Sequence, residues 1–278
     1  MKNIDLKKYK RVFAFGCSFT QYMYPTWANI IHKSMDSTVP FYSLARSGGG
    51  NMFIANRLTE ANRKYKFDET DLVLLMWSTY CRLDFYNSGD LVVEPSNNFG
   101  TGWVTAGNIY SQDLISQEVI KRIGDVNWFL MRDFSVIDLT TTYLENLPCD
   151  HIKFMSVPLD FNTYQNLEMG DLSNSIVDTY SFLKDKYPIT LFEHMDKKWP
   201  QIIKYYDHNH GLFTDYHPSP VDYLNYLQRF DIKLSDASID YAHDSFSKIM
   251  VPNQTKRDII NTFAECDQYI SNSYRQAW

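Results

Sequence analysis

Short apolar-rich runs alternate along the chain with longer stretches of helical spacing. Apolar runs with little polar alternation are typical of strands buried on both faces of a parallel sheet. The predicted strands are residues 12–15, 41–44, 71–77, 151–158 and 189–192. Residues 27–35 and 52–65 repeat apolar positions with the period of an amphipathic helix. This alternation predicts an α/β fold, a three-layer α/β/α sandwich around a mainly parallel five-stranded sheet.

Two segments fall outside this alternation. Residues 83–117 are rich in Asn, Gly, Tyr and Trp, which predicts an insertion, either a lid that contacts substrate or a packed structural excursion. Residues 233–278 form a C-terminal extension, with helical spacing between positions 256 and 270. We therefore expect one domain over residues 1–232 and an extension that packs on it as a cover or an oligomer contact.

Charge and composition exclude several classes of function. The chain has 278 residues and a formal net charge of -6, and its Lys and Arg residues are scattered, so we expect no nucleic-acid partner. No apolar run is long enough for a signal peptide or a membrane span, which predicts a cytoplasmic protein without a membrane partner. The four cysteines lie far apart in the sequence, and this spacing is typical of reduced thiols.

The candidate chemistry lies near the two ends of the chain. Ser18 follows the first predicted strand, and Asp215 and His217 precede a stretch of helical spacing. A serine on a strand-to-turn position, a histidine base and an aspartate that orients the base are the parts of a serine nucleophile. Alone, Ser18 would more often cap the following helix. Cys17 beside it is expected to be a buried core thiol.

Three short blocks in this order resemble those of the SGNH (GDSL-type) hydrolases. Residues 16–19 (GCSF) match the first block, residues 47–51 (SGGGN) the second, and residues 217–219 (HPS) the last. The third block, expected at residues 76–80, lacks the family asparagine, and Asp215 stands two residues before the histidine where the family has three. The resemblance implies a flavodoxin-like SGNH-type sandwich and a Ser18, His217 and Asp215 triad.

The resemblance also implies an oxyanion hole made of the Ser18 and Gly48 amides and a donor from the third block. Ser78 or Thr79 would supply a hydroxyl in place of the missing asparagine, with Asn51 and Arg82 as further candidates. Arg82 has two other interpretations, an ion pair with Asp84 or a contact with an anionic group of the substrate. Asn51, Arg82 and Trp103 are the predicted substrate-binding residues.

The function predicted from these residues is a serine esterase that hydrolyses an O-acyl ester on a carbohydrate. Two alternatives stay open: an acyltransferase with the same serine, and an inactive glycan-binding module in which the third block has decayed. A further alternative is a metal site at His208, His210, Asp215 and His217. Their spacing matches no known zinc motif, so we expect neither a metal nor a cofactor.

Overall fold

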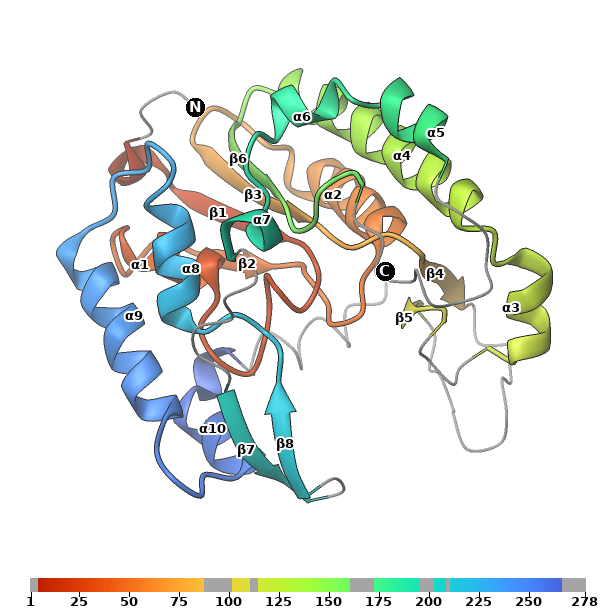
Figure 1. Cartoon of the computed structure of the whole chain (residues 1–278). Helices are drawn as coiled ribbons and strands as arrows, with labels where there is room; N and C mark the ends of the chain where they lie inside the picture. Colours follow the sequence, from red (N-terminus) through yellow and green to blue (C-terminus); the bar gives the residue numbers. More distant parts are fainter. Residues whose placement is uncertain are drawn as a thin grey trace.

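A parallel sheet forms the centre of the molecule. The computed structural model describes residues 5–87, 102–110, 115–160, 173–195, 203–208 and 211–266. Within them the sheet has four strands in the order β2-β1-β3-β6, and every pairing is parallel. The strands are β1 (Arg11–Phe15), β2 (Phe41–Ser43), β3 (Asp71–Trp77) and β6 (Asp150–Met155). The predicted α/β fold with a mainly parallel sheet is thus confirmed (Figure 1).

Alternate side chains of each strand enter different hydrophobic clusters. In β3, Val73 and Leu75 belong to one cluster, and Leu72 and Leu74 belong to the other. Both sets are fully buried, which explains why the strand sequence is a continuous apolar run rather than an alternating one. The sheet is therefore covered on both faces (Figure 1).

Helices supply the covering layers. The first face packs against α2 (Asn51–Tyr65), α4 (Val126–Glu145), α5 (Asn174–Thr179) and α6 (Leu183–Lys186). The second packs against α1 (Trp27–Lys33), α7 (Leu191–Met195), α8 (Pro220–Leu227) and α9 (Asp236–Ile249). The described part of the chain has three further short helices: η1 (Leu6–Lys8), α3 (Gln117–Ile123) and α10 (Lys256–Thr262).

The prediction of a fifth strand at residues 189–192 is wrong. Thr190 and Glu193 form a reciprocal cap: the Thr190 amide donates to Glu193 Oε2 at 3.0 Å, and the Glu193 amide donates to Thr190 Oγ1 at 3.2 Å. This Thr-x-x-Glu pattern starts a helix, here α7. Its buried Leu191 and Met195 pack on the sheet, and this packing accounts for the apolar residues that suggested a strand.

Two antiparallel hairpins stand apart from the central sheet. β4 (Arg82–Asn87) pairs with β5 (Gly102–Asn108) inside the predicted insertion, whose residues 88–101 and 111–114 lie outside the described part. β7 (Ile203–Asp207) pairs with β8 (Gly211–Asp215), and the sequence pattern did not predict this pair. β8 runs directly into the segment of His217 (Figure 1).

The C-terminal extension begins with α9, which packs beside α1 and α8. The Ser34 hydroxyl donates to Ser238 Oγ at 2.7 Å and joins α9 to the end of α1. The helix predicted between positions 256 and 270 is α10, and residues 267–278 lie outside the described part. Ile259 and Phe263 pack with Ile203 and Tyr205 of β7 in a third apolar cluster. All four cysteines are buried. No helix in the described ranges is both long and apolar enough to cross a bilayer.

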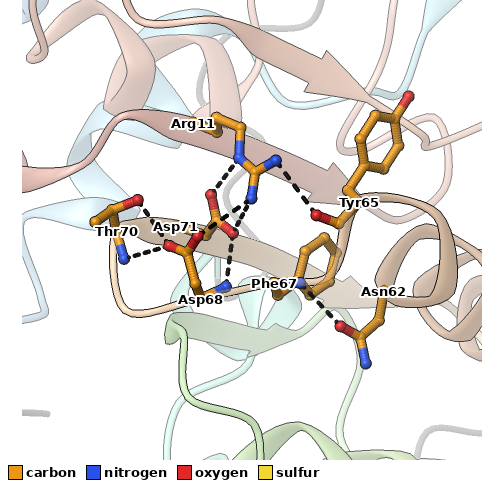
Figure 2. Close-up of polar contacts among 7 residues, drawn as sticks. All are labelled: Arg11, Asn62, Tyr65, Phe67, Asp68, Thr70 and Asp71. Carbon is orange, nitrogen blue, oxygen red and sulfur yellow. Dashed lines mark hydrogen bonds and ion pairs between the residues drawn. The ribbon is translucent and has the colours of Figure 1, made fainter.

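A buried ion pair joins the amino ends of β1 and β3. Arg11 and Asp71 are register partners, and Nε and Nη2 of the guanidinium donate to the two carboxylate oxygens, each at 2.7 Å. The Asp71 side chain is fully buried and also accepts the Asp68 amide at 2.9 Å. Figure 2 shows the carboxylate lying between these donors. The pair therefore specifies the register of the two strands that carry the first and third sequence blocks.

We predict that Asp71→Asn lowers the free energy of unfolding by about 3 kcal/mol, because it leaves a guanidinium facing a buried site without its counter-charge. Urea unfolding of the variant measures this loss. Asp68→Asn is the matched control, since Asp68 is exposed and lies 3.7 Å from Arg11. An equal loss in both variants would contradict a special role for Asp71.

Candidate active site

Ser18 lies on the tight turn that follows β1. The amides of Thr20 and Gln21 both donate to the Cys17 carbonyl, at 2.9 and 3.1 Å, and this closes the turn around the serine. A Cβ on Gly16 would lie 2.0 Å from Thr20 Oγ1, so only glycine permits this close approach. Ser18 itself is 6% exposed, and Cys17 is buried in the core as predicted. The turn thus places Ser18 at the carboxyl end of a central strand.

Asp215 and His217 form a hydrogen-bonded pair at the end of β8. Asp215 Oδ1 accepts the His217 backbone amide at 2.9 Å and contacts His217 Nδ1 at 2.7 Å. The first contact is an Asx turn, in which a carboxylate binds the backbone two residues on. This turn explains how a spacing of two residues still brings the carboxylate to the ring. With Nδ1–H facing Asp215, Nε2 is left as the proton acceptor.

The segment that carries Ser18 packs directly on this pair. The ring of Phe19 meets the His217 ring edge-on, with centroids 5.4 Å apart, and the ring of Tyr22 stacks on it at 3.9 Å. The Tyr22 hydroxyl donates to Asp215 Oδ2 at 2.9 Å. The structure therefore brings together two segments that lie almost 200 residues apart, as the candidate triad requires.

Ser18 Oγ and His217 form no hydrogen bond with each other among the described residues, so the two candidate catalytic side chains are linked through the packing of Phe19 and Tyr22 on His217. Catalytic hydrogen bonds are often long before substrate binds. Among the described residues, the amides of Ser18 and Gly48 find no acceptor either. Both N–H groups are thus left without a hydrogen-bond partner in this part of the chain.

The second block is a loop connected to the first. The Arg46 amide donates to the Gly16 carbonyl at 3.1 Å, which ties the two blocks together. Gly48 has a φ of +75° and approaches the Thr105 carbonyl of β5 so closely that an added Cβ would lie 3.2 Å from it. A side chain at Gly48 would therefore be strained and crowded. The β4–β5 hairpin packs over this glycine loop.

In the third block, the two candidate hydroxyls differ in their surroundings. Ser78 is fully buried, and its Oγ has no partner among the described residues. Thr79 is partly exposed, and its Oγ1 accepts Arg82 Nε at 2.8 Å. An acceptor role leaves the hydroxyl proton of Thr79 available for donation. Arg82 Nη1 also donates to the Gly49 carbonyl at 3.0 Å, so its guanidinium bridges the second and third blocks.

Asn51 is a buried brace between the blocks. Its Oδ1 accepts the Ser78 amide at 2.9 Å, and its Nδ2 donates to the Ser78 carbonyl at 3.4 Å. The Asn51 side chain also interacts with the buried Asp133 of α4 and lowers the pKa of that carboxyl. Burial raises the pKa of Asp133 to about 7, against the opposing effect of the adjacent Arg132 guanidinium. Both polar ends of Asn51 thus bind the protein itself.

A second buried carboxylate caps α2. Asp84 of β4 accepts the amides of Gly50 and Phe53 at 2.9 and 3.1 Å, where the helix leaves its first N–H groups unpaired. Burial raises the pKa of Asp84. The sequence does not identify Asp84 as a helix cap, and it gives no reason to select Asp133. An acidic residue on a strand or in a helix has no sequence pattern that shows which loop it contacts.

Trp103, the remaining predicted substrate-binding residue, lies on β5 and packs over α2. Its indole Nε1 donates to Glu60 at 3.4 Å, and its ring meets Phe53 edge-on at 5.8 Å. Tyr86 of β4 packs edge-on against the same indole, at 5.9 Å, and is about half exposed. Within the described residues no cluster of His, Cys, Asp or Glu is arranged to hold a metal ion, and His210 lies outside them.

Comparison with known proteins gives little further information. No model of a protein family matches the chain, and no curated protein matches its sequence. Among solved structures, the crystal structure of protein YXIM_BACsu from Bacillus subtilis is similar at a TM-score of 0.37 and 11% identity. The matched region covers 89% of this chain and 58% of that one. At this level of similarity no residue role follows from the comparison.

We predict that Asp133 makes the protein less stable as pH rises. The folded state keeps a proton on this carboxyl up to about pH 7, whereas the unfolded chain releases it near its ordinary pKa of about 4. The free energy of unfolding should therefore fall between pH 5 and pH 8, and Asp133→Asn should remove about 2.5 kcal/mol of that fall.

Urea unfolding of wild type and Asp133→Asn at both pH values measures the difference. Asp178→Asn, at an exposed position of α5, is the control. If the free energy of unfolding changes by the same amount from pH 5 to pH 8 in wild type and in Asp133→Asn, the prediction is contradicted.

Proposed function

We propose that the protein is a serine ester hydrolase of the SGNH type, with Ser18 as the nucleophile and His217 as the base. The observation that carries the proposal is the Asp215–His217 pair, which packs through Phe19 and Tyr22 on the turn that holds Ser18. The helix-covered parallel sheet supports this assignment, since ligands of such sheets bind at the carboxyl ends of the strands. Ser18 and Thr79 both follow such strand ends.

The reaction would proceed through an acyl-enzyme. Ser18 Oγ attacks the ester carbonyl while its proton passes to His217 Nε2, and the carbonyl electron pair moves onto oxygen. Collapse of this intermediate breaks the ester bond, and the alcohol leaves with the proton from His217. Water then attacks the acyl-enzyme by the same route and releases the carboxylic acid. Asp215 keeps Nδ1 protonated and stabilises the imidazolium that forms in each step.

The oxyanion would be held by the amides of Ser18 and Gly48 and by the hydroxyl of Thr79. Both amides lack an acceptor in the described part of the chain. Of the two candidate hydroxyls, only that of Thr79 is partly exposed. Arg82 positions Thr79 Oγ1 and the Gly49 carbonyl at once, which supports a role in holding the two blocks together.

An O-acyl group on a carbohydrate is the substrate class that we propose. The aromatic pair of Tyr86 and Trp103 on the β4–β5 hairpin supports it, since aromatic faces stack on sugar rings and this hairpin packs over the Gly48 loop. An acyltransferase would use the same serine with a sugar hydroxyl in place of water. A glycan-binding module would keep these residues without turnover.

Labelling with a fluorophosphonate probe tests the nucleophile. We expect modification of Ser18, mapped by peptide mass, and loss of both labelling and nitrophenyl acetate hydrolysis in Ser18→Ala, with little change in melting temperature. Ser247→Ala, on α9, is the control and should behave as wild type. Labelling of Ser18 without hydrolysis would favour the acyltransferase, and wild type that takes no label would contradict the serine mechanism.

The third oxyanion donor is tested by substitutions at Thr79. We expect Thr79→Ala to lower kcat by about 10²- to 10³-fold with little change in KM, because the oxyanion exists mainly in the transition state. Thr79→Ser keeps the hydroxyl and should retain most of the activity. Ser78→Ala should have a small effect, since the Ser78 side chain is fully buried. A larger loss in Ser78→Ala than in Thr79→Ala would reverse the assignment.

A further inference from the structure

Asp215 receives more hydrogen bonds than its contact with His217 requires. Its Oδ2, the oxygen that does not contact the imidazole, accepts the Tyr22 hydroxyl at 2.9 Å and a longer bond from Tyr24 at 3.5 Å. The carboxylate is 1% exposed, so these phenols replace the water that would otherwise solvate its charge. The segment between β1 and α1 thus contributes both the candidate nucleophile and the donors to Asp215.

Tyr22 contacts both members of the pair. Its ring stacks on the His217 imidazole at 3.9 Å and 20° while its hydroxyl reaches the carboxylate. Tyr205 also interacts electrostatically with both Tyr22 and Asp215. Tyr22 is thus the residue that contacts the imidazole and the carboxylate at once.

From this arrangement we infer that Tyr22 is a positioning residue for the base, which fixes the orientation of the imidazole by its ring and the charge distribution of Asp215 by its hydroxyl. The inference rests on the proposed function, because it assigns a purpose to the same Asp215–His217 pair. Tyr24 adds a second contact to His217, since its hydroxyl donates to the His217 carbonyl at 3.4 Å. Ser18 and Tyr22 lie in the same short segment after β1, so this segment places the nucleophile and also positions the base.

The phenols around Asp215 stay protonated at neutral pH. The groups that interact electrostatically with the Asp215 carboxylate include the phenols of Tyr22, Tyr24, Tyr205 and Tyr223, with Asp222 and Cys17 beyond Tyr223. Burial raises the pKa of Tyr205 to about 12 and those of the other three phenols further. Burial also raises the pKa of Asp222. The phenols therefore stay protonated as donors at neutral pH.

Two substitutions separate the hydroxyl from the ring. Tyr22→Phe keeps the stacked ring and removes the donor to Oδ2. The carboxylate charge then concentrates on the bond to Nδ1–H, so the midpoint of His217 titration in the NMR spectrum should rise by about 0.5–1 pH unit. Tyr22→Leu also removes the stacking surface, and kcat should fall by on the order of tenfold below that of Tyr22→Phe, with KM within about twofold.

The matched control is Tyr206→Phe, the same chemical change on the exposed neighbour of Tyr205. The titration needs no substrate and is assigned with His217→Asn, so it stands even if wild type hydrolyses no ester. A raised midpoint in Tyr22→Phe but not in Tyr206→Phe supports the positioning role. An unchanged midpoint in Tyr22→Phe, or an equal shift in the control, overturns it. If the midpoint of His217 titration shifts in Tyr22→Phe but wild type hydrolyses no ester, the proposed esterase activity is contradicted and the positioning role of Tyr22 is not.

Discussion

The parallel pairing of β1 with β3 is the constraint on which the rest of the structure depends. Five consecutive register pairs join the two strands, from Arg11–Asp71 to Phe15–Leu75. The buried salt bridge at their amino ends sets that register, and a slip by one residue would exchange the side chains that enter the two apolar clusters. Because the strands run in the same direction, the turns that follow them lie at one edge of the sheet.

The candidate site is built by adding three supports to that edge. The Asx turn at the end of β8 presents His217, the glycine loop presents the Gly48 amide, and Asn51 holds the third block by its Ser78 backbone. Asp215 of the Asx turn and Asn51 are both buried and hydrogen-bonded, which suits a site that must hold dipoles in place before substrate arrives. The cost is a group of carboxylates in low dielectric, among them Asp133, whose pKa is raised by burial to about 7.

The sequence predicts the core strands well because apolar runs have few alternative structures. It fails at residues 189–192, where a Thr-x-x-Glu cap starts a helix. It also fails at β7 and β8, which are short, partly exposed strands without an apolar run. The Asp215–His217 pair is visible in the sequence because its members are two residues apart. Tyr22, Asp84 and Asp133 are not, since each acts through contacts with distant segments that only the fold brings together.

The central claim is that Ser18 carries a covalent acyl group during turnover. Rapid acid quench of the protein mixed with nitrophenyl acetate, followed by peptide mass analysis, measures this most directly. The account predicts an acetyl group on the peptide that contains Ser18, formed with a burst of nitrophenol and accumulating further in His217→Ala if deacylation is the slower step. Hydrolysis without any acylated peptide, or acylation of a different residue, would contradict it.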